Sequence, residues 1–160
     1  MFCDEALDAV EAIAAGETTA EGRIAEWVGE FLASPGSDNA TLAAGLAQRR
    51  HWWLGPLQLP VADLTRLAGP EPSIECPIDP EDWNDEVELM NEELDEGWEP
   101  PPLLAQWSPE YQALLVQDGN HRLEALLREG ASHAWVIAWF DDPDERDRFV
   151  AKLIQTEMSR

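Results

Sequence analysis

Hydrophobic residues recur with helical spacing through the first fifty residues of this 160-residue chain. The pattern predicts helices over residues 4–15, 18–33 and 41–50, because apolar groups three and four positions apart share one helix face. The second of these helices carries the longest stripe, formed by Ile24, Trp27, Val28, Phe31 and Leu32. We therefore expect a helical N-terminal extension over residues 1–54.

From residue 55 onward, short extended segments alternate with helices and turns. Residues 57–60 suit a strand, and residues 61–67 suit a short helix or turn. Residues 69–80 contain one glycine and four prolines, which predicts a loop. Asp79 followed by Pro80 is a favourable helix start, with aspartate as the N-cap and proline in the first helical position. The helix that begins there should end at Gly97.

The last third of the chain contains the strongest strand patterns. Residues 103–107 and 111–117 read as two strands of a hairpin, and residues 120–129 as a helix. Residues 134–140 are apolar at every position, as in a strand that is buried on both faces. A final helix after Asp142 should turn its apolar residues inward: Phe149, Leu153 and Ile154. The order of elements predicts an α+β domain over residues 55–160, forming one compact unit with the extension.

The chain is strongly acidic, with 33 Asp and Glu against 10 Lys and Arg and a net charge of -23. A protein that binds DNA neutralises phosphates with basic side chains, so we expect no stable DNA binding. The same repulsion disfavours an anionic membrane surface, and no apolar run is long enough to cross a bilayer. Cys3 and Cys76 are too few for a disulfide framework and lack the spacing of a metal site, which favours a cytoplasmic location.

The segment from Leu114 to Leu126 carries the clearest candidate chemistry. A buried strand runs into a tight turn at Asp118 and Gly119, and a helix begins at once. A helix start offers unpaired N–H groups and the positive end of the helix dipole, which together bind anions. His121 and Arg122 add two donors for phosphate oxygens, and Asp118 could hold a divalent metal or accept a proton.

Each of these residues also has an ordinary structural explanation. An Asp-Gly pair is a common turn, Asn120 alone is a helix cap, and Arg122 could pair with a nearby carboxylate. The chain contains no zinc signature, no phosphate-binding loop with a glycine–lysine pair and no nucleophile elbow. The acidic residues 81–96 lack the loop spacing of a calcium site and are expected to be a solvated helix face.

The sequence resembles the ParB/sulfiredoxin-like family over roughly residues 55–141. The segments that carry the resemblance are GPLQLPVADLTRL, PPLLAQW, LLVQDGNHRLEALLREG and WVIAWF. The resemblance implies a small mixed sheet flanked by helices, with Gly119, His121 and Arg122 in the family's phosphate-binding turn. Asn120 stands where sulfiredoxins have their redox cysteine, so the chain is not expected to be a sulfiredoxin.

Among the branches of the family, the turn is most similar to that of the free-serine kinases, which reads Asp-Gly-His-His-Arg. In ParB proteins the corresponding turn binds CTP, but here too few residues follow it for the DNA-reading domain. The family's arginine in the loop after the first strand is missing, because Gly69-Pro70-Glu71-Pro72 stands there. Glu71 or Glu75 could supply a carboxylate at this loop.

The resemblance and the turn together predict binding of a nucleotide or another phosphorylated small molecule. The expected phosphate-binding residues are Gly119, Asn120, His121 and Arg122. If the chain is an enzyme, it resembles a small-molecule phosphotransferase using ATP or ADP with Mg²⁺. Asp118 and His121 would then be the catalytic residues, and Asp118 the magnesium ligand. The alternative is a non-catalytic interaction or regulatory module that acts through a protein partner or as a homodimer.

Overall fold

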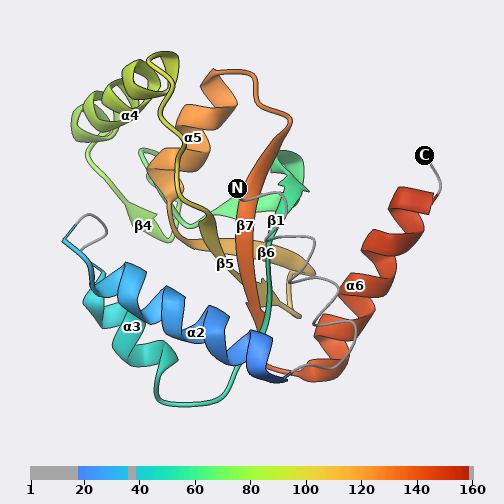
Figure 1. Cartoon of the computed structure of the whole chain (residues 1–160). Helices are drawn as coiled ribbons and strands as arrows, with labels where there is room; N and C mark the ends of the chain where they lie inside the picture. Colours follow the sequence, from blue (N-terminus) through green and yellow to red (C-terminus); the bar gives the residue numbers. More distant parts are fainter. Residues whose placement is uncertain (1–17, 36–38, 159–160) are drawn as a thin grey trace. The chain divides into compact units, whose positions relative to one another are not determined.

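The structure is a computed structural model that describes residues 18–35 and 39–158 (Figure 1). The helix expected over residues 4–15 lies outside the described residues. Contacts between Cα atoms divide the chain into two compact units, one formed by residues 1–55 with 138–160 and the other by residues 56–137. A domain boundary between residues 54 and 55 stays a prediction.

The first unit contains three described helices: α2 (Thr18–Ala33), α3 (Ala40–Leu46) and α6 (Pro143–Met158). The apolar stripe of α2 is confirmed at its centre, where Val28 and Leu32 are fully buried. Trp27 on the same stripe is 39% exposed and stacks on Phe31. Helix α3 ends four residues earlier than expected, because the chain tightens into a turn in which the Gln48 N–H bonds to the Gly45 carbonyl.

Helix α6 begins as the sequence predicts. The Asp142 carboxylate accepts a hydrogen bond from the Asp144 N–H at 2.8 Å, which satisfies one of the unpaired groups at the helix start. The Phe149 ring packs on Phe140 with a centroid separation of 5.6 Å. Ile154 is 50% exposed, so its predicted inward position is wrong.

A five-stranded sheet has the order β1-β7-β5-β6-β2. Its strands are β1 (Trp52–Pro60), β2 (Leu64–Arg66), β5 (Leu103–Ser108), β6 (Ala113–Asp118) and β7 (His133–Phe140). The predicted hairpin is confirmed, since β5 and β6 pair antiparallel, whereas β2 pairs parallel with β6. The sheet is therefore mixed, and the predicted α+β class with a small mixed sheet is confirmed.

Three segments between residues 52 and 80 differ from the sequence prediction. Strand β1 begins at Trp52 rather than at residue 57, because Pro56 does not interrupt a strand at the edge of a sheet. Residues 61–67 form a short 3₁₀ turn (Val61–Asp63) followed by strand β2. The predicted loop over residues 69–80 holds one short pairing, between β3 (Ala68–Gly69) and β4 (Cys76–Pro77).

Two helices of the second unit pack on each other: α4 (Pro80–Asp95) and α5 (Asn120–Arg128). Helix α4 starts as predicted, with the Asp79 carboxylate accepting hydrogen bonds from the N–H groups of Glu81 and Asp82. Trp83, Val87 and Ala125 form the buried contact between the two helices.

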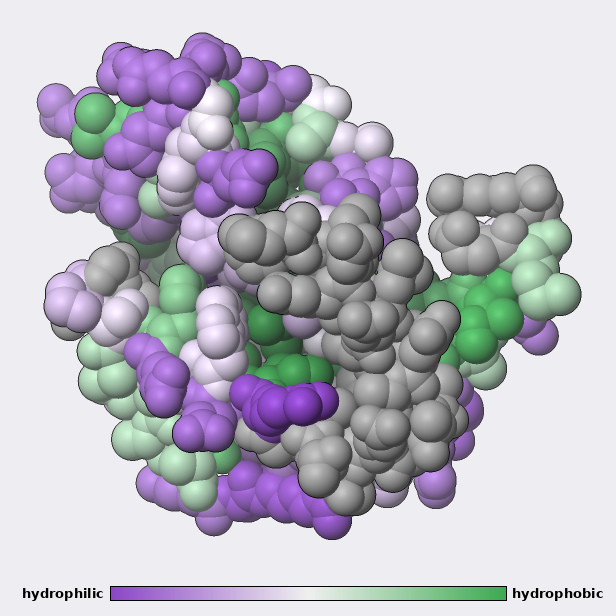
Figure 2. Space-filling model, viewed as in Figure 1, coloured by the Kyte–Doolittle hydropathy of each residue, from purple (hydrophilic) through white to green (hydrophobic). Residues whose placement is uncertain are grey.

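The outer surface of α4 is hydrophilic, as Figure 2 shows, which agrees with its many carboxylates. This arrangement confirms the expected solvated face over residues 81–96. Among the described helices, none is both long and apolar enough to span a bilayer.

Candidate functional site

The candidate turn joins the end of β6 to the start of α5, as the sequence predicts. Gly119 is the N-cap residue of α5 and has a left-handed conformation with φ +101°. No side chain caps the helix, because the N-cap residue is glycine. The N–H groups of the first helical turn and the positive end of the helix dipole therefore lie at this turn, as in helix starts that bind anions.

Asn120 is buried, with 8% exposure, and its amide makes three hydrogen bonds within the protein. Its Oδ1 accepts from the N–H groups of Leu67 at 2.9 Å and Ala68 at 3.3 Å. Its Nδ2 donates to the Val116 carbonyl at 3.0 Å. Asn120 thus fastens the segment that follows β2 to the start of α5.

Arg122 is also buried, with 7% exposure. Its Nη2 lies 2.9 Å from Oδ2 of Asp118, and its Nη1 donates to the Pro101 carbonyl at 3.0 Å. Burial lowers the pKa of the guanidinium, and the Asp118 carboxylate opposes that shift. Arg122 joins the end of β6 to the segment that precedes β5.

His121 lies against helix α4. Its ring packs on Trp83 with a centroid separation of 4.4 Å, and its Nε2 lies 3.1 Å from Oε2 of Glu86. Burial lowers the pKa of the imidazole, and the Glu86 carboxylate raises it by a smaller amount. The balance favours the neutral ring at neutral pH, the form that can accept a proton.

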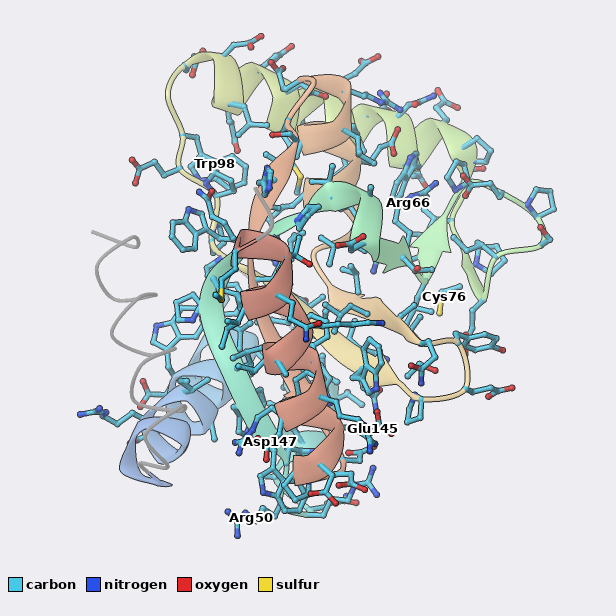
Figure 3. All side chains as sticks on the ribbon, turned by 90° about the vertical axis from the view of Figure 1, so that its right-hand side faces the viewer. Arg50, Arg66, Cys76, Trp98, Glu145 and Asp147 are labelled. Carbon is cyan, nitrogen blue, oxygen red and sulfur yellow. The ribbon has the colours of Figure 1, made fainter. Side chains whose placement is uncertain are left out.

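Arg66, at the end of β2, is the residue that the sequence argument missed. Its guanidinium lies over the Trp83 ring, 5.2 Å from the centroid, and beside the start of α4 (Figure 3). It donates to the Ala68 carbonyl and forms an ion pair with Glu71, and its Nε lies 3.8 Å from Oε2 of Glu124. Arg66 is the only Lys or Arg between Arg50 and Arg122. A single basic residue in such an acidic stretch is the feature of the sequence that could have identified it as a site residue.

The structure therefore brings an arginine to the loop where the family's arginine was expected to be missing. An added Cβ at Gly69 would collide with the Arg66 guanidinium, so this close approach requires glycine. Of the two carboxylates considered for this loop, Glu71 lies beside Arg66, and its pKa is lowered by the hydrogen bond from that guanidinium. Glu75 is exposed.

Asp118, the predicted magnesium ligand, forms an ion pair with Arg122. Within residues 18–35 and 39–158, no group of three or more His, Cys, Asp or Glu side chains could hold a metal ion. Magnesium often takes only one or two protein carboxylates together with substrate phosphates. The magnesium role of Asp118 and the catalytic roles of Asp118 and His121 therefore stay predictions.

Replacing Gly119 by alanine should lower the free energy of unfolding by about 2 kcal/mol. A residue with a Cβ in this conformation costs roughly 1 kcal/mol, and crowding adds a similar amount. The added Cβ would lie 2.7 Å from both Leu103 Cδ2 and Arg122 Nη2. Gly97→Ala is the matched control, because Gly97 has φ +97° and open space around it. Equal losses in urea denaturation of the two variants would contradict the crowding.

Lowering the pH below about 6.5 should destabilise the protein through His121. Between the unfolded-state pKa and the lower folded-state pKa, the unfolded chain binds a proton that the folded chain does not. The free energy of unfolding then falls as the pH falls, by less than about 1.4 kcal/mol per pH unit because solvent screens a partly exposed ring. Urea denaturation from about pH 7.5 to about pH 5.5 measures this slope.

The His121→Gln variant should show a shallower fall over this range than the wild type. His133→Gln, which removes a histidine elsewhere in the second unit, is the control and should keep the wild-type slope. An unchanged slope in His121→Gln would show that other groups cause the fall.

No protein-family profile and no curated protein matches the chain. Among solved structures it is similar to a conserved hypothetical protein from Pyrococcus furiosus, with 20% identity over 54% of this chain and 32% of that chain (TM-score 0.40). It is also similar to free serine kinase in complex with AMP, with 19% identity over 51% of this chain and 30% of that chain (TM-score 0.40). A Pnob8-like ParB-N domain shows 17% identity over 67% of this chain and 36% of that chain (TM-score 0.36). The chain thus spans about a third of the length of each of these proteins.

Proposed function

We propose that the chain binds a nucleotide or another phosphorylated small molecule at the start of α5. The observation that carries this proposal is the glycine N-cap, which leaves the helix start without a side-chain cap. A phosphate group at this position would accept hydrogen bonds from the backbone and interact with the positive end of the dipole. The position of Gly119 and His121 at the start of α5, directly after strand β6, supports the proposal.

Arg66 would supply the side-chain donor, and His121 would lie beside the bound phosphate. Both pack on the Trp83 ring, and the hydrogen bonds of Asn120 hold the segment after Arg66 against the helix start. An arginine can grip two phosphate oxygens at once. Its partner Glu71 is exposed on 47% of its side chain and carries a single charge. A phosphate with more charge would compete well for the same guanidinium.

If the chain is a phosphotransferase, positioning and charge would supply most of its rate. Magnesium bound to the nucleotide would neutralise phosphate charge, with Asp118 as the residue that holds it. His121, neutral at pH 7, would accept the proton of an acceptor hydroxyl. Arg122 would keep Asp118 in place through their ion pair.

Calorimetric titration with ATP, ADP and CTP, each with Mg²⁺, tests the proposal. We expect micromolar binding that Arg66→Gln and His121→Gln each weaken at least tenfold, or about 1.4 kcal/mol. Arg128→Gln is the control, because Arg128 lies at the other end of α5 and should not affect binding. Absence of heat with all three nucleotides, or equal effects of the three variants, would contradict the proposal.

A second candidate function follows from the pairing of the basic side chains. Arg66 is paired with Glu71, His121 with Glu86 and Arg122 with Asp118. This pairing favours a non-catalytic module that works through a protein partner. Glu71→Gln distinguishes the two, because freeing Arg66 should raise nucleotide affinity severalfold at a working site. In a non-catalytic module, neither the wild type nor this variant would bind nucleotide.

A further inference from the structure

The first unit contains a pocket of about 600 Å³, and none of the residues of the candidate functional site lines it. Helices α2 and α3 line it mainly with small and apolar residues, among them Val28, Gly29, Ala43 and Leu46. Gly29 leaves one wall open, since a Cβ added there would meet nothing within 4 Å. The helical part of the lining is thus suited to an apolar group.

One end of the pocket is polar. Arg49, Arg50 and His51 follow one another along the chain and all line the pocket. Such a run is unusual in a protein with 10 basic and 33 acidic residues, so an anion is repelled less here than over most of the chain. Among the described residues that line the pocket, Glu26 on α2 is the one that carries a carboxylate.

His51 is held in a defined orientation. Its side chain is 5% exposed, and its Nδ1 lies 3.0 Å from Oδ1 of Asp141, which also pairs with Arg49 at 2.9 Å. The rings of Trp53 and Trp139 meet the imidazole edge-on at centroid separations of 6.1 and 6.5 Å. The carboxylate accepts a hydrogen bond from Nδ1 and fixes the orientation of the ring, as in other Asp–His pairs.

The other ring nitrogen of His51 has no hydrogen-bond partner. Nε2 is buried and unpaired in the part of the chain that the structure describes. A buried polar atom without a partner is costly, and in native proteins it calls for an explanation such as a bound group. In the charged ring, Nε2 would donate a hydrogen bond to an anion.

Arg50 adds a second donor at the same end. Its guanidinium lies 5.0 Å from the centroid of the Trp52 ring, and its side chain extends outward from the ribbon (Figure 3). Within residues 18–35 and 39–158, Arg50 forms no ion pair. Its charge is thus available to a ligand at the pocket.

We propose that this pocket binds a small amphipathic carboxylate. Its apolar part would lie against Val28, Gly29 and Ala43, and its carboxylate would meet Nε2 of His51 and the guanidinium of Arg50. The proposal does not depend on the nucleotide site, because the two sets of residues share no member.

Calorimetric titration of the full chain with hexanoate tests the proposal, and hexanamide is the neutral probe of nearly the same shape. We expect hexanoate to bind at least tenfold more tightly than hexanamide. Replacing His51 by phenylalanine keeps an aromatic ring, removes both nitrogens and should weaken hexanoate binding at least tenfold. Equal affinities for the two probes, or no binding of either, would overturn the proposal.

Gly29→Leu tests the location without risk to the fold, because leucine is a better helix former than glycine and would fill open space. This variant should abolish hexanoate binding while its melting temperature stays the same or rises. Gly45→Leu is the matched control: Gly45 lies on α3, has open space around it and does not line the pocket. Wild-type binding by Gly29→Leu, or equal loss in both variants, would place hexanoate elsewhere and overturn the proposal.

Discussion

Arg122→Met should lower the free energy of unfolding by about 4 kcal/mol, because it removes a buried guanidinium and the ion pair that this group makes with the partly buried Asp118 carboxylate. Methionine nearly matches the length of the arginine stem but removes the guanidinium. Asp118, with 14% of its side chain exposed, would keep its charge in a poorly solvated place, and the Pro101 carbonyl would lose a donor. Urea denaturation at neutral pH measures the loss.

The Asp118→Asn/Arg122→Met double variant shows whether the loss comes from the unpaired charge. Removing both charges should cost less than the sum of the two single variants by more than about 1 kcal/mol, since neither group is then left alone. Arg148→Met is the surface control, because Arg148 pairs with Glu145 but is 68% exposed, and it should cost less than about 1 kcal/mol. Additive losses at positions 118 and 122 would show that the pair is not coupled.

Asn120→Ala should destabilise the protein by about 4 kcal/mol, because one buried and two partly buried backbone groups lose their hydrogen bonds to Asn120 at roughly 1–3 kcal/mol each. Those groups are the N–H of Leu67, the N–H of Ala68 and the carbonyl of Val116. Thermal and urea denaturation give the loss in stability. Hydrogen exchange at Leu67 and Ala68 should quicken, since both amides lose their acceptor.

Asn91→Ala provides the matched comparison for Asn120. Asn91 donates from one nitrogen to the Ala125 carbonyl and to Glu129, and it is only partly buried. Its removal should cost about 1 kcal/mol, because water can replace the lost donor. If the two variants lose similar stability, Asn120 does not fasten the loop after β2.

The elements that the sequence predicts correctly are those with local indications. Asp79 and Pro80 mark the start of α4, and Gly119 marks the start of α5, because caps and turns depend on a few adjacent residues. Strand β2 was missed because its three residues are stabilised by pairing with β6, which lies some fifty residues further along the chain. A segment that short has no periodicity of its own.

In the candidate site too, features formed by adjacent residues could be predicted, whereas contacts between distant segments could not. The strand, the glycine turn and the helix start at residues 118–122 could be predicted, because they are contiguous. The sequence did not reveal the partners of Asn120, which lie on the segment after β2. It did not reveal the contribution of Arg66 either, since only the fold brings that guanidinium to Trp83, the residue on which His121 packs.

The division of the chain into two units affects the order in which it can fold during synthesis. Residues 56–137 are contiguous, so everything that the second unit needs has been synthesised before residue 138 is added. The first unit draws on both ends of the chain and can close only once α6 has left the ribosome. The unit with the glycine turn can thus form first, whereas the unit with the amphipathic pocket can close only after the residues from 138 onward have followed.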